Sequence, residues 1–108
     1  MQYGIAFRYA SDELRANKDV AIAAVEHDGI LLKFAHESIR DDINVALAAV
    51  SQTGWALRYA SKRLQGHRAI VTRAIQVTPK AIKFASDRMK GDTDIVLLLT
   101  GQAPLTWW

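Results

Sequence analysis

The chain has no cysteine among its 108 residues. Disulfide bonds, thiolate metal sites and thiol nucleophiles are therefore excluded, and a cytoplasmic protein is favoured. No apolar run approaches the roughly 18–20 residues that a membrane-spanning helix needs, because the longest, Val20 to Val25 and Val45 to Val50, have six. Residues 1–4 lack the basic and apolar regions of a signal peptide. We therefore expect no membrane partner.

Patterns that carry chemistry are also scarce. The three histidines, His27, His36 and His67, share no helix at metal-binding spacing. A glycine-rich phosphate loop is absent as well. These absences favour a protein that is not an enzyme and that holds no metal and no cofactor.

The sequence does contain an internal repeat of 25 residues. The stretch from Gly54 to Ser61 has relatives that begin at Gly4, Gly29 and Pro79. The units are therefore 4–28, 29–53, 54–78 and 79–103, called units 1 to 4 below, and 104–108 begins a fifth. We treat residues 1–108 as a single repeat domain.

Six positions of the unit, counted from its Gly or Pro, keep one residue type in all four copies. They are position 4, large and apolar (Phe7, Leu32, Leu57, Ile82); position 5, basic (Arg8, Lys33, Arg58, Lys83); position 6, aromatic (Tyr9, Phe34, Tyr59, Phe84); position 7, Ala (Ala10, Ala35, Ala60, Ala85); position 11, aliphatic or Met (Leu14, Ile39, Leu64, Met89); and position 17, β-branched (Val20, Val45, Ile70, Ile95).

The spacing of the apolar positions predicts helices. Positions 4, 7 and 11 form one helical face, and Asp28, Thr53 and Thr78 stand where N-caps are expected. A first helix of about eleven residues, a break at positions 12–15 and a second helix at positions 15–24 follow. The fold class is all-α: a short α-solenoid of four 25-residue helix-turn-helix repeats with about eight to nine short helices.

The repeat also resembles a known family. The strings Tyr59-Ala60-Ser61 and Val45-Ala46-Leu47-Ala48-Ala49-Val50 are similar to the repeat of the domain of unknown function DUF4116. The second helices of units 3 and 4 depart from that pattern. The resemblance implies tandem repeats in larger proteins, and it implies no activity and no functional residues.

The net charge of +3 is distributed unevenly, as −2, −1, +5 and +1 over units 1 to 4. Position 5 forms a basic column, and three of its members have an acid four residues later, which favours local ion pairs: Arg8–Asp12, Lys33–Glu37 and Lys83–Asp87. In unit 3 that acid is replaced by Lys62, so Arg58, Lys62 and Arg63 have no acid nearby on their own helix.

A partner surface is therefore predicted in unit 3. Arg73 stands in a column of Ala23, Ala48 and Leu98, which indicates exposure. Lys80 in the column of Trp55 likewise indicates that Trp55 is partly exposed. The predicted surface consists of Trp55, Arg58, Lys62, Arg63, His67, Arg68 and Arg73.

Other positions have structural interpretations. Position 8 (Ser11, His36, Ser61, Ser86) favours a small polar residue at a helix edge over catalysis, because no orienting acid is specified. The aromatic column favours packing between units over base stacking. Trp107 and Trp108 are possible contacts at the end of the array.

The leading interpretation is a helical-repeat scaffold that binds a protein partner, or a fragment of such a scaffold. The alternative is nucleic-acid binding through the basic third unit. Self-association through the open ends of the array is a third possibility, because no polar capping unit is present.

Overall fold

The computed structural model describes residues 3–101, with side chains from residue 6 onward, and every regular element in this range is helical. The all-α prediction is confirmed for that range. None of the helices described there is long and apolar enough to cross a membrane. In chain order the elements are α1 (Tyr3–Arg8), α2 (Asp12–Arg15), α3 (Lys18–His27), η1 (Gly29–Phe34), α4 (Glu37–Arg40), α5 (Ile43–Gln52), η2 (Gly54–Tyr59), α6 (Lys62–Gln65), α7 (Arg68–Val77), η3 (Pro79–Phe84), α8 (Asp87–Lys90) and α9 (Thr93–Thr100).

The predicted first helix of about eleven residues is wrong, because the chain breaks it after position 6. In unit 3, Ala60 (ψ 156°) and Ser61 (ψ 159°) are extended, and the short helix α6 follows. The Ser61 hydroxyl accepts the backbone N–H of Leu64, so the residue at position 8 caps this new helix. Each unit thus has three helical segments instead of two, which gives twelve within residues 3–101.

The break also joins consecutive units. Its extended backbone turns the N–H of position 8 away from the helix, and this N–H donates to the carbonyl of position 12 in the preceding unit. The three donor–acceptor pairs are His36 to Arg15 (3.0 Å), Ser61 to Arg40 (3.1 Å) and Ser86 to Gln65 (2.9 Å). The residue that interrupts the helix therefore supplies a backbone hydrogen bond at each of these junctions.

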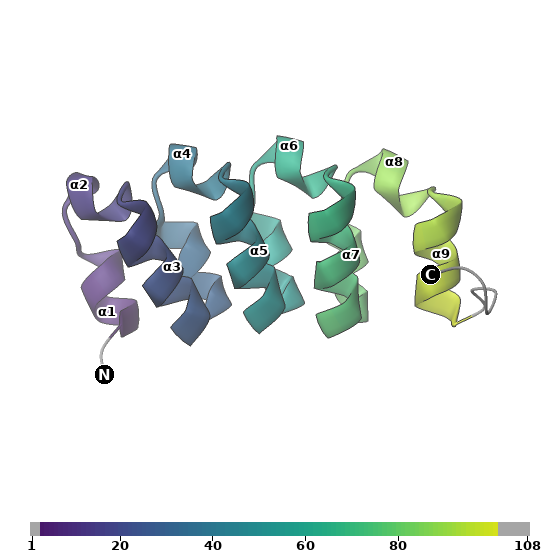
Figure 1. Cartoon of the computed structure of the whole chain (residues 1–108), viewed down its shortest axis with the longest axis horizontal. Coiled ribbons are helices and arrows are strands. Elements are labelled where there is room, and N and C mark those ends of the chain that lie inside the picture. The colour runs from purple at the N-terminus through teal and green to yellow at the C-terminus, as the bar shows by residue number, and fades with distance from the viewer. Residues whose placement is uncertain (1–2, 102–108) are drawn as a thin grey trace.

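The elements are arranged in two rows with a row of short helices along one edge (Figure 1). The front row consists of α3, α5, α7 and α9, and η1, η2 and η3 lie behind it. The helices α2, α4, α6 and α8 form the upper edge in this view. The described chain is elongated, with principal extents of 47 × 25 × 20 Å. Neighbouring units are consequently in contact, while units 1 and 4 lie at opposite ends.

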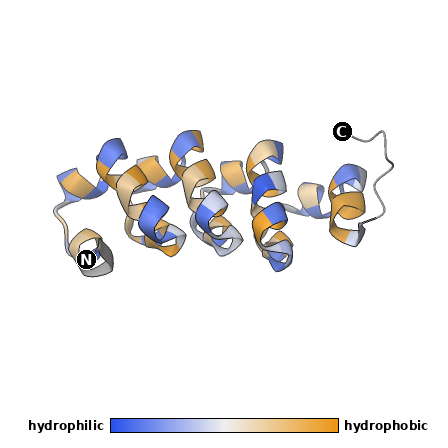
Figure 2. Cartoon of the chain, turned by 60° about the horizontal axis from the view of Figure 1, so that its bottom comes forward, coloured by the Kyte–Doolittle hydropathy of each residue, from blue (hydrophilic) through white to orange (hydrophobic). Residues whose placement is uncertain are grey.

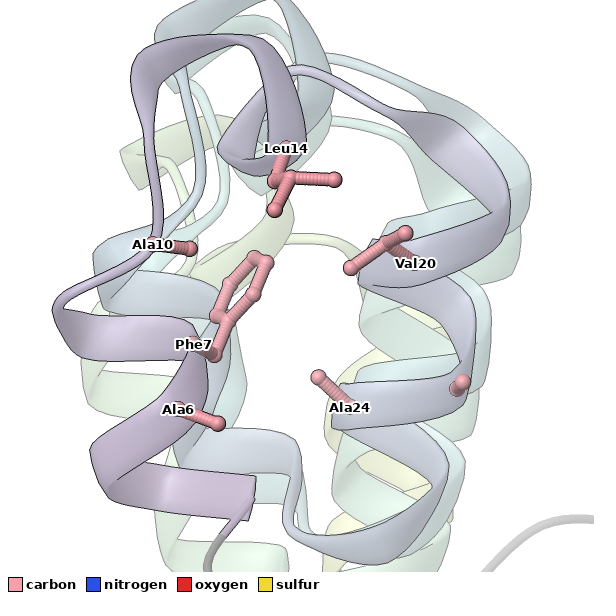
Figure 3. Close-up of a pocket in the computed structure, with 7 residues that line it drawn as sticks. Ala6, Phe7, Ala10, Leu14, Val20 and Ala24 are labelled. Carbon is pink, nitrogen blue, oxygen red and sulfur yellow. The ribbon is translucent and has the colours of Figure 1, made fainter.

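The hydrophobic core runs between the two rows. Leu57, Leu64 and Ile70, at positions 4, 11 and 17 of unit 3, have no exposed surface. Each helix carries hydrophobic and hydrophilic residues along its length, as Figure 2 shows, because only one side of it faces this core. In unit 1, Phe7 is buried in this core but Leu14 is exposed, and both line a space between α1 and α3 (Figure 3).

Two glycines allow the rows to approach each other closely. A Cβ atom added to Gly29 would lie 2.4 Å from the Ala49 carbonyl oxygen, and one added to Gly54 would lie 2.3 Å from that of Ala74. These glycines open η1 and η2, and the alanines belong to α5 and α7. Any larger residue at the start of either 3₁₀ helix would push it away from the long helix of its own unit.

Replacing Gly54 by alanine is expected to lower the free energy of unfolding by about 1–3 kcal/mol, because the new methyl group would overlap backbone. Urea denaturation followed by circular dichroism measures this change. Gly91→Ala is the matched control, since its Cβ would meet only the Asp87 carbonyl oxygen at an ordinary 3.7 Å. Equal stability of the two variants would contradict the close approach.

Candidate functional site

The structure separates the residues of the surface predicted in unit 3 into two groups. Trp55, Arg58 and Lys62 line hollows on the surface of units 2 to 4. Arg63, Arg68 and Arg73 instead interact with side chains of neighbouring units. His67 occupies the N-cap of α7 without a side-chain cap bond. The predicted set is therefore not one uniform basic patch.

Arg63 interacts with Asp41 of unit 2. Its Nε lies 3.0 Å from a carboxylate oxygen of Asp41, and its Nη2 donates to the Asp41 carbonyl over 2.8 Å. The Ser61 hydroxyl donates to the same carboxylate. The hydrogen bond from Ser61 and the guanidinium of Arg63 lower the pKa of Asp41 below its usual range.

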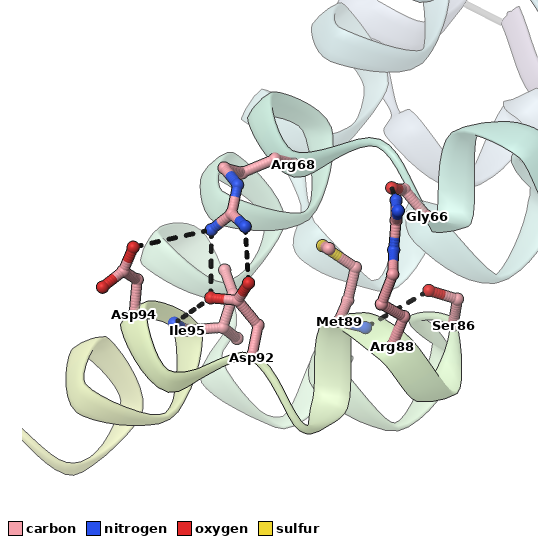
Figure 4. Close-up of polar contacts among 8 residues, drawn as sticks. All are labelled: Gly66, Arg68, Ser86, Arg88, Met89, Asp92, Asp94 and Ile95. Carbon is pink, nitrogen blue, oxygen red and sulfur yellow. Dashed lines mark hydrogen bonds and ion pairs between the residues drawn. The ribbon is translucent and has the colours of Figure 1, made fainter.

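Arg68 interacts with two acids of unit 4 (Figure 4). Its Nη1 lies 3.0 Å from Oδ1 of Asp92, its Nη2 donates to Oδ2, and Asp94 lies 3.8 Å away. Asp92 also accepts the backbone N–H of Ile95 and so caps α9. The hydrogen bond from Arg68 lowers the pKa of Asp92 to about 2 and raises that of Arg68.

Arg73 is exposed, as its column predicts, and its Nε donates to the Ser51 hydroxyl of unit 2 over 3.1 Å. The acids that neutralise part of unit 3 thus come from units 2 and 4. They are 22 to 26 residues away in the sequence, so spacing within one helix does not reveal them.

The basic column at position 5 has a different set of partners from the predicted one. Among the described residues, none of the cations Arg8, Lys33 and Lys83 forms an ion pair with the acid at position 9, and Asp12 pairs with Arg15 instead. The break after position 6 removes the helical turn that those pairs needed. The cations lie over aromatic rings: Arg8 over Tyr9 and Phe34, Lys33 over Phe34, Arg58 over Tyr59 and Phe84, and Lys83 over Trp55 and Phe84.

Trp55 makes this column different at the junction of units 3 and 4. Its ring meets that of Phe84 edge to face, with centroids 6.0 Å apart. Lys83 Nζ lies 5.4 Å from the Trp55 centroid and 5.2 Å from that of Phe84. The guanidinium carbon of Arg58 lies 5.8 Å from the Phe84 centroid as well. Trp55 itself is 37% exposed, so this cluster faces solvent.

Three hollows meet around these side chains, with volumes of about 240, 340 and 410 Å³. Arg58 lines the first two, Lys62 the second and third, and Lys83 the first and third. We call the cationic and aromatic residues that line these hollows in units 3 and 4 the cation–aromatic surface; it consists of Trp55, Arg58, Tyr59, Lys62, Lys83 and Phe84.

Half of this surface was missed by the sequence interpretation. The sequence predicts that Tyr59 and Phe84 pack between units. Both do pack against the core, but they are only partly buried, so part of each ring is open to solvent. Lys83 was assigned to an ion pair with Asp87. One pattern in the sequence predicts this cluster. It is a tryptophan at position 2 of one unit (Trp55) combined with a basic and an aromatic residue at positions 5 and 6 of the next unit (Lys83 and Phe84).

The serines at position 8 have a structural role in the described residues. Ser11, Ser61 and Ser86 accept backbone N–H groups at the starts of short helices, which confirms the helix-edge interpretation of position 8. No group of residues in the described range could hold a metal ion. The predicted end contacts Trp107 and Trp108 lie outside the described residues.

Comparisons with known proteins identify one family. The family model for Domain of unknown function (DUF4116) matches residues 1–33 and 17–65, which together span more than half of the chain. The matches cover units 1 and 2 and the start of unit 3, in agreement with the resemblance seen in the sequence. No curated protein and no solved structure matches the chain.

The pair Arg68–Asp92 predicts a pH-dependent stability. Because the pKa of Asp92 is lowered from 3.8 to about 2 on folding, its contribution is present above pH 4 and is lost as the pH falls towards 2. Asp92→Asn keeps a capping side chain and removes the charge. The difference in free energy of unfolding between wild type and this variant should therefore shrink between pH 4 and pH 2.

Urea denaturation at a series of pH values measures this difference. The same comparison in an Arg68→Gln background is the control, since the partner cation is then missing. An unchanged pH dependence in that background would show that Arg68 does not lower the pKa of Asp92.

Proposed function

Because the chain belongs to the DUF4116 family, whose description assigns no activity, we propose a function from its surface: a non-enzymatic α-solenoid scaffold that binds an acidic segment of a protein partner. The solenoid consists of the four 25-residue units. The binding site is the cation–aromatic surface at the junctions of units 2, 3 and 4.

One observation carries this proposal: the exposed cations of this surface face aromatic rings and hollows, not carboxylates. Arg58 lies over Tyr59 and Phe84, and Lys83 lies over Trp55 and Phe84. No acid of the described chain pairs with Arg58, Lys62 or Lys83. A ring holds a cation with its hydrogen-bond donors still available, so a carboxylate can bind without first displacing an internal acid.

The chemistry of the hollows favours an acidic peptide over a nucleic acid. Sequence-tolerant nucleic-acid binding uses aromatic rings with open faces on which bases stack. Here Lys83 lies over the rings of Trp55 and Phe84, and Arg58 lies over that of Tyr59. Nucleic-acid binding stays the alternative prediction.

The scaffold role rests on the shape of the surface. The three hollows are shared among three consecutive units, so an extended segment can contact more than one unit at once. Trp55 supplies a large, partly exposed apolar ring beside the cations. An aromatic anchor flanked by basic groups is typical of the energetic centre of a protein interface.

Fluorescence anisotropy with labelled oligoglutamate tests the proposal, with oligolysine of equal length as the reference. Binding to oligoglutamate alone is expected. Arg58→Ala and Lys83→Ala should each weaken it by about tenfold, because a charge-assisted hydrogen bond contributes about 1.5 kcal/mol.

Lys33→Ala is the matched control for these variants. Lys33 also occupies position 5 over an aromatic ring, but it lines none of the three hollows. An equal loss of oligoglutamate affinity in Lys33→Ala would show that the effect comes from the net charge of the chain and not from the cation–aromatic surface. Labelled single-stranded RNA that binds more tightly than oligoglutamate, with a steep salt dependence and a loss in Arg58→Ala, would favour the alternative function.

A further inference from the structure

The outer face of unit 1 is an open apolar hollow of about 320 Å³. Figure 3 shows Phe7 from α1, Leu14 from α2 and Val20 from α3 directed into it. Alanines complete its lining, at residues 6, 10, 23 and 24. This face is separate from the cation–aromatic surface, whose residues belong to units 3 and 4.

In the other three units the same positions are covered. Position 11 is 48% exposed in unit 1, where it is Leu14, but only 7%, 0% and 2% exposed as Ile39, Leu64 and Met89. Position 3 behaves alike: Ala6 is exposed, whereas Leu31, Ala56 and Ala81 are buried. Units 2 to 4 each have a preceding unit against this face. The hollow is thus the half of a unit–unit interface that has no counterpart among the described residues.

The opposite half is found on unit 4. The long helices of units 1 and 2 pack against the first and third helices of the next unit, and that of unit 3 packs against η3, the first helix of unit 4. Position 18 on that helix is fully buried as Ala21, Ala46 and Val71, but Val96 in unit 4 is 40% exposed. A unit 4 therefore presents an apolar residue where a unit 1 presents an apolar hollow.

The polar groups of the two faces also match. Each internal junction has a hydrogen bond from the N–H of position 8 to the carbonyl of position 12 in the preceding unit. Within the described residues, the Ser11 N–H has no such acceptor and the Lys90 carbonyl has no such donor. Position 10 reaches back across the junction to the carbonyl of position 13, from Arg63 to Asp41 and from Arg88 to Gly66. In unit 1 position 10 is the acidic Glu13, and in unit 4 the basic Lys90 directly precedes position 13.

We propose that the outer face of unit 1 binds unit 4 of a second copy of this chain, head to tail. The contact repeats the apolar and backbone parts of the internal junction, since Val96 enters the hollow beside Leu14 and Ser11 donates to the Lys90 carbonyl. An ion pair between Glu13 and Lys90 is added to them. Because the two faces differ, the association is heterologous and extends to chains of copies instead of stopping at a symmetric dimer. The inference does not depend on the proposed function.

Sedimentation velocity over a range of protein concentrations tests the association. The wild-type chain should show a mass that rises with concentration. Leu14→Glu should weaken this self-association at least about tenfold, because a charge would be buried in the contact. Leu14 is half exposed, so the variant keeps its fold, which circular dichroism verifies.

Leu47→Glu is the matched control. Leu47 is an exposed leucine (37%) on α5, in the middle of the array, and its substitution should leave the association unchanged. A wild-type chain that stays monomeric throughout, or a Leu14→Glu variant that associates like wild type, would overturn the proposal.

Cross-linking determines the orientation. Since the chain has no cysteine, Glu13→Cys and Lys90→Cys each introduce a single thiol. A mixture of the two variants should form disulfide-linked dimers, whereas neither variant should do so alone. Dimers of Glu13→Cys alone would indicate a symmetric contact and refute the head-to-tail arrangement. A variant that ends at Ala103 should still associate. Loss of association would show that residues 104–108, and not unit 4, bind the hollow.

Discussion

The structure depends on one backbone hydrogen bond that recurs at each internal junction, from the N–H of position 8 to the carbonyl of position 12 in the preceding unit. Two extended residues release this N–H from the helix, and a serine or histidine side chain compensates by capping the next helix. The bond brings position 8 of one unit against position 12 of the preceding unit at each of these junctions. The core, the interunit ion pairs and the cation–aromatic contacts all follow from that placement.

The sequence predicted those parts of the fold that depend on contacts within one unit. The long helix at positions 15–24 and its caps Asn17, Asp42 and Asp92 are as expected. The break after position 6 was missed, because Ala60 and Ser61 lie within an apolar pattern that a continuous helix would also satisfy. Ser11 in unit 1 is extended in the same way (ψ 160°) without such a carbonyl among the described residues. The serine that caps the following helix therefore already favours the break, and the carbonyl of the preceding unit adds to it where it is present.

The candidate site was predicted less completely. Charge counted within unit 3 identified Arg58 and Lys62, which do line the hollows. It also selected Arg63 and Arg68, whose acids belong to units 2 and 4. Trp55 was found because its column tolerates lysine, but its neighbours Lys83 and Phe84 are nearly 30 residues away in the sequence. Pairs that cross a junction become predictable once the position 8 to position 12 bond defines which residues face each other.

The sequence separation of the residues joined by interunit hydrogen bonds has a consequence for folding. Those that cross a junction connect residues only 20 to 24 positions apart. The loops that must close are therefore short, and the entropy lost in closing each one is small. Any two adjacent units can serve as a nucleus, and the rest of the chain can add to it on either side, one unit at a time.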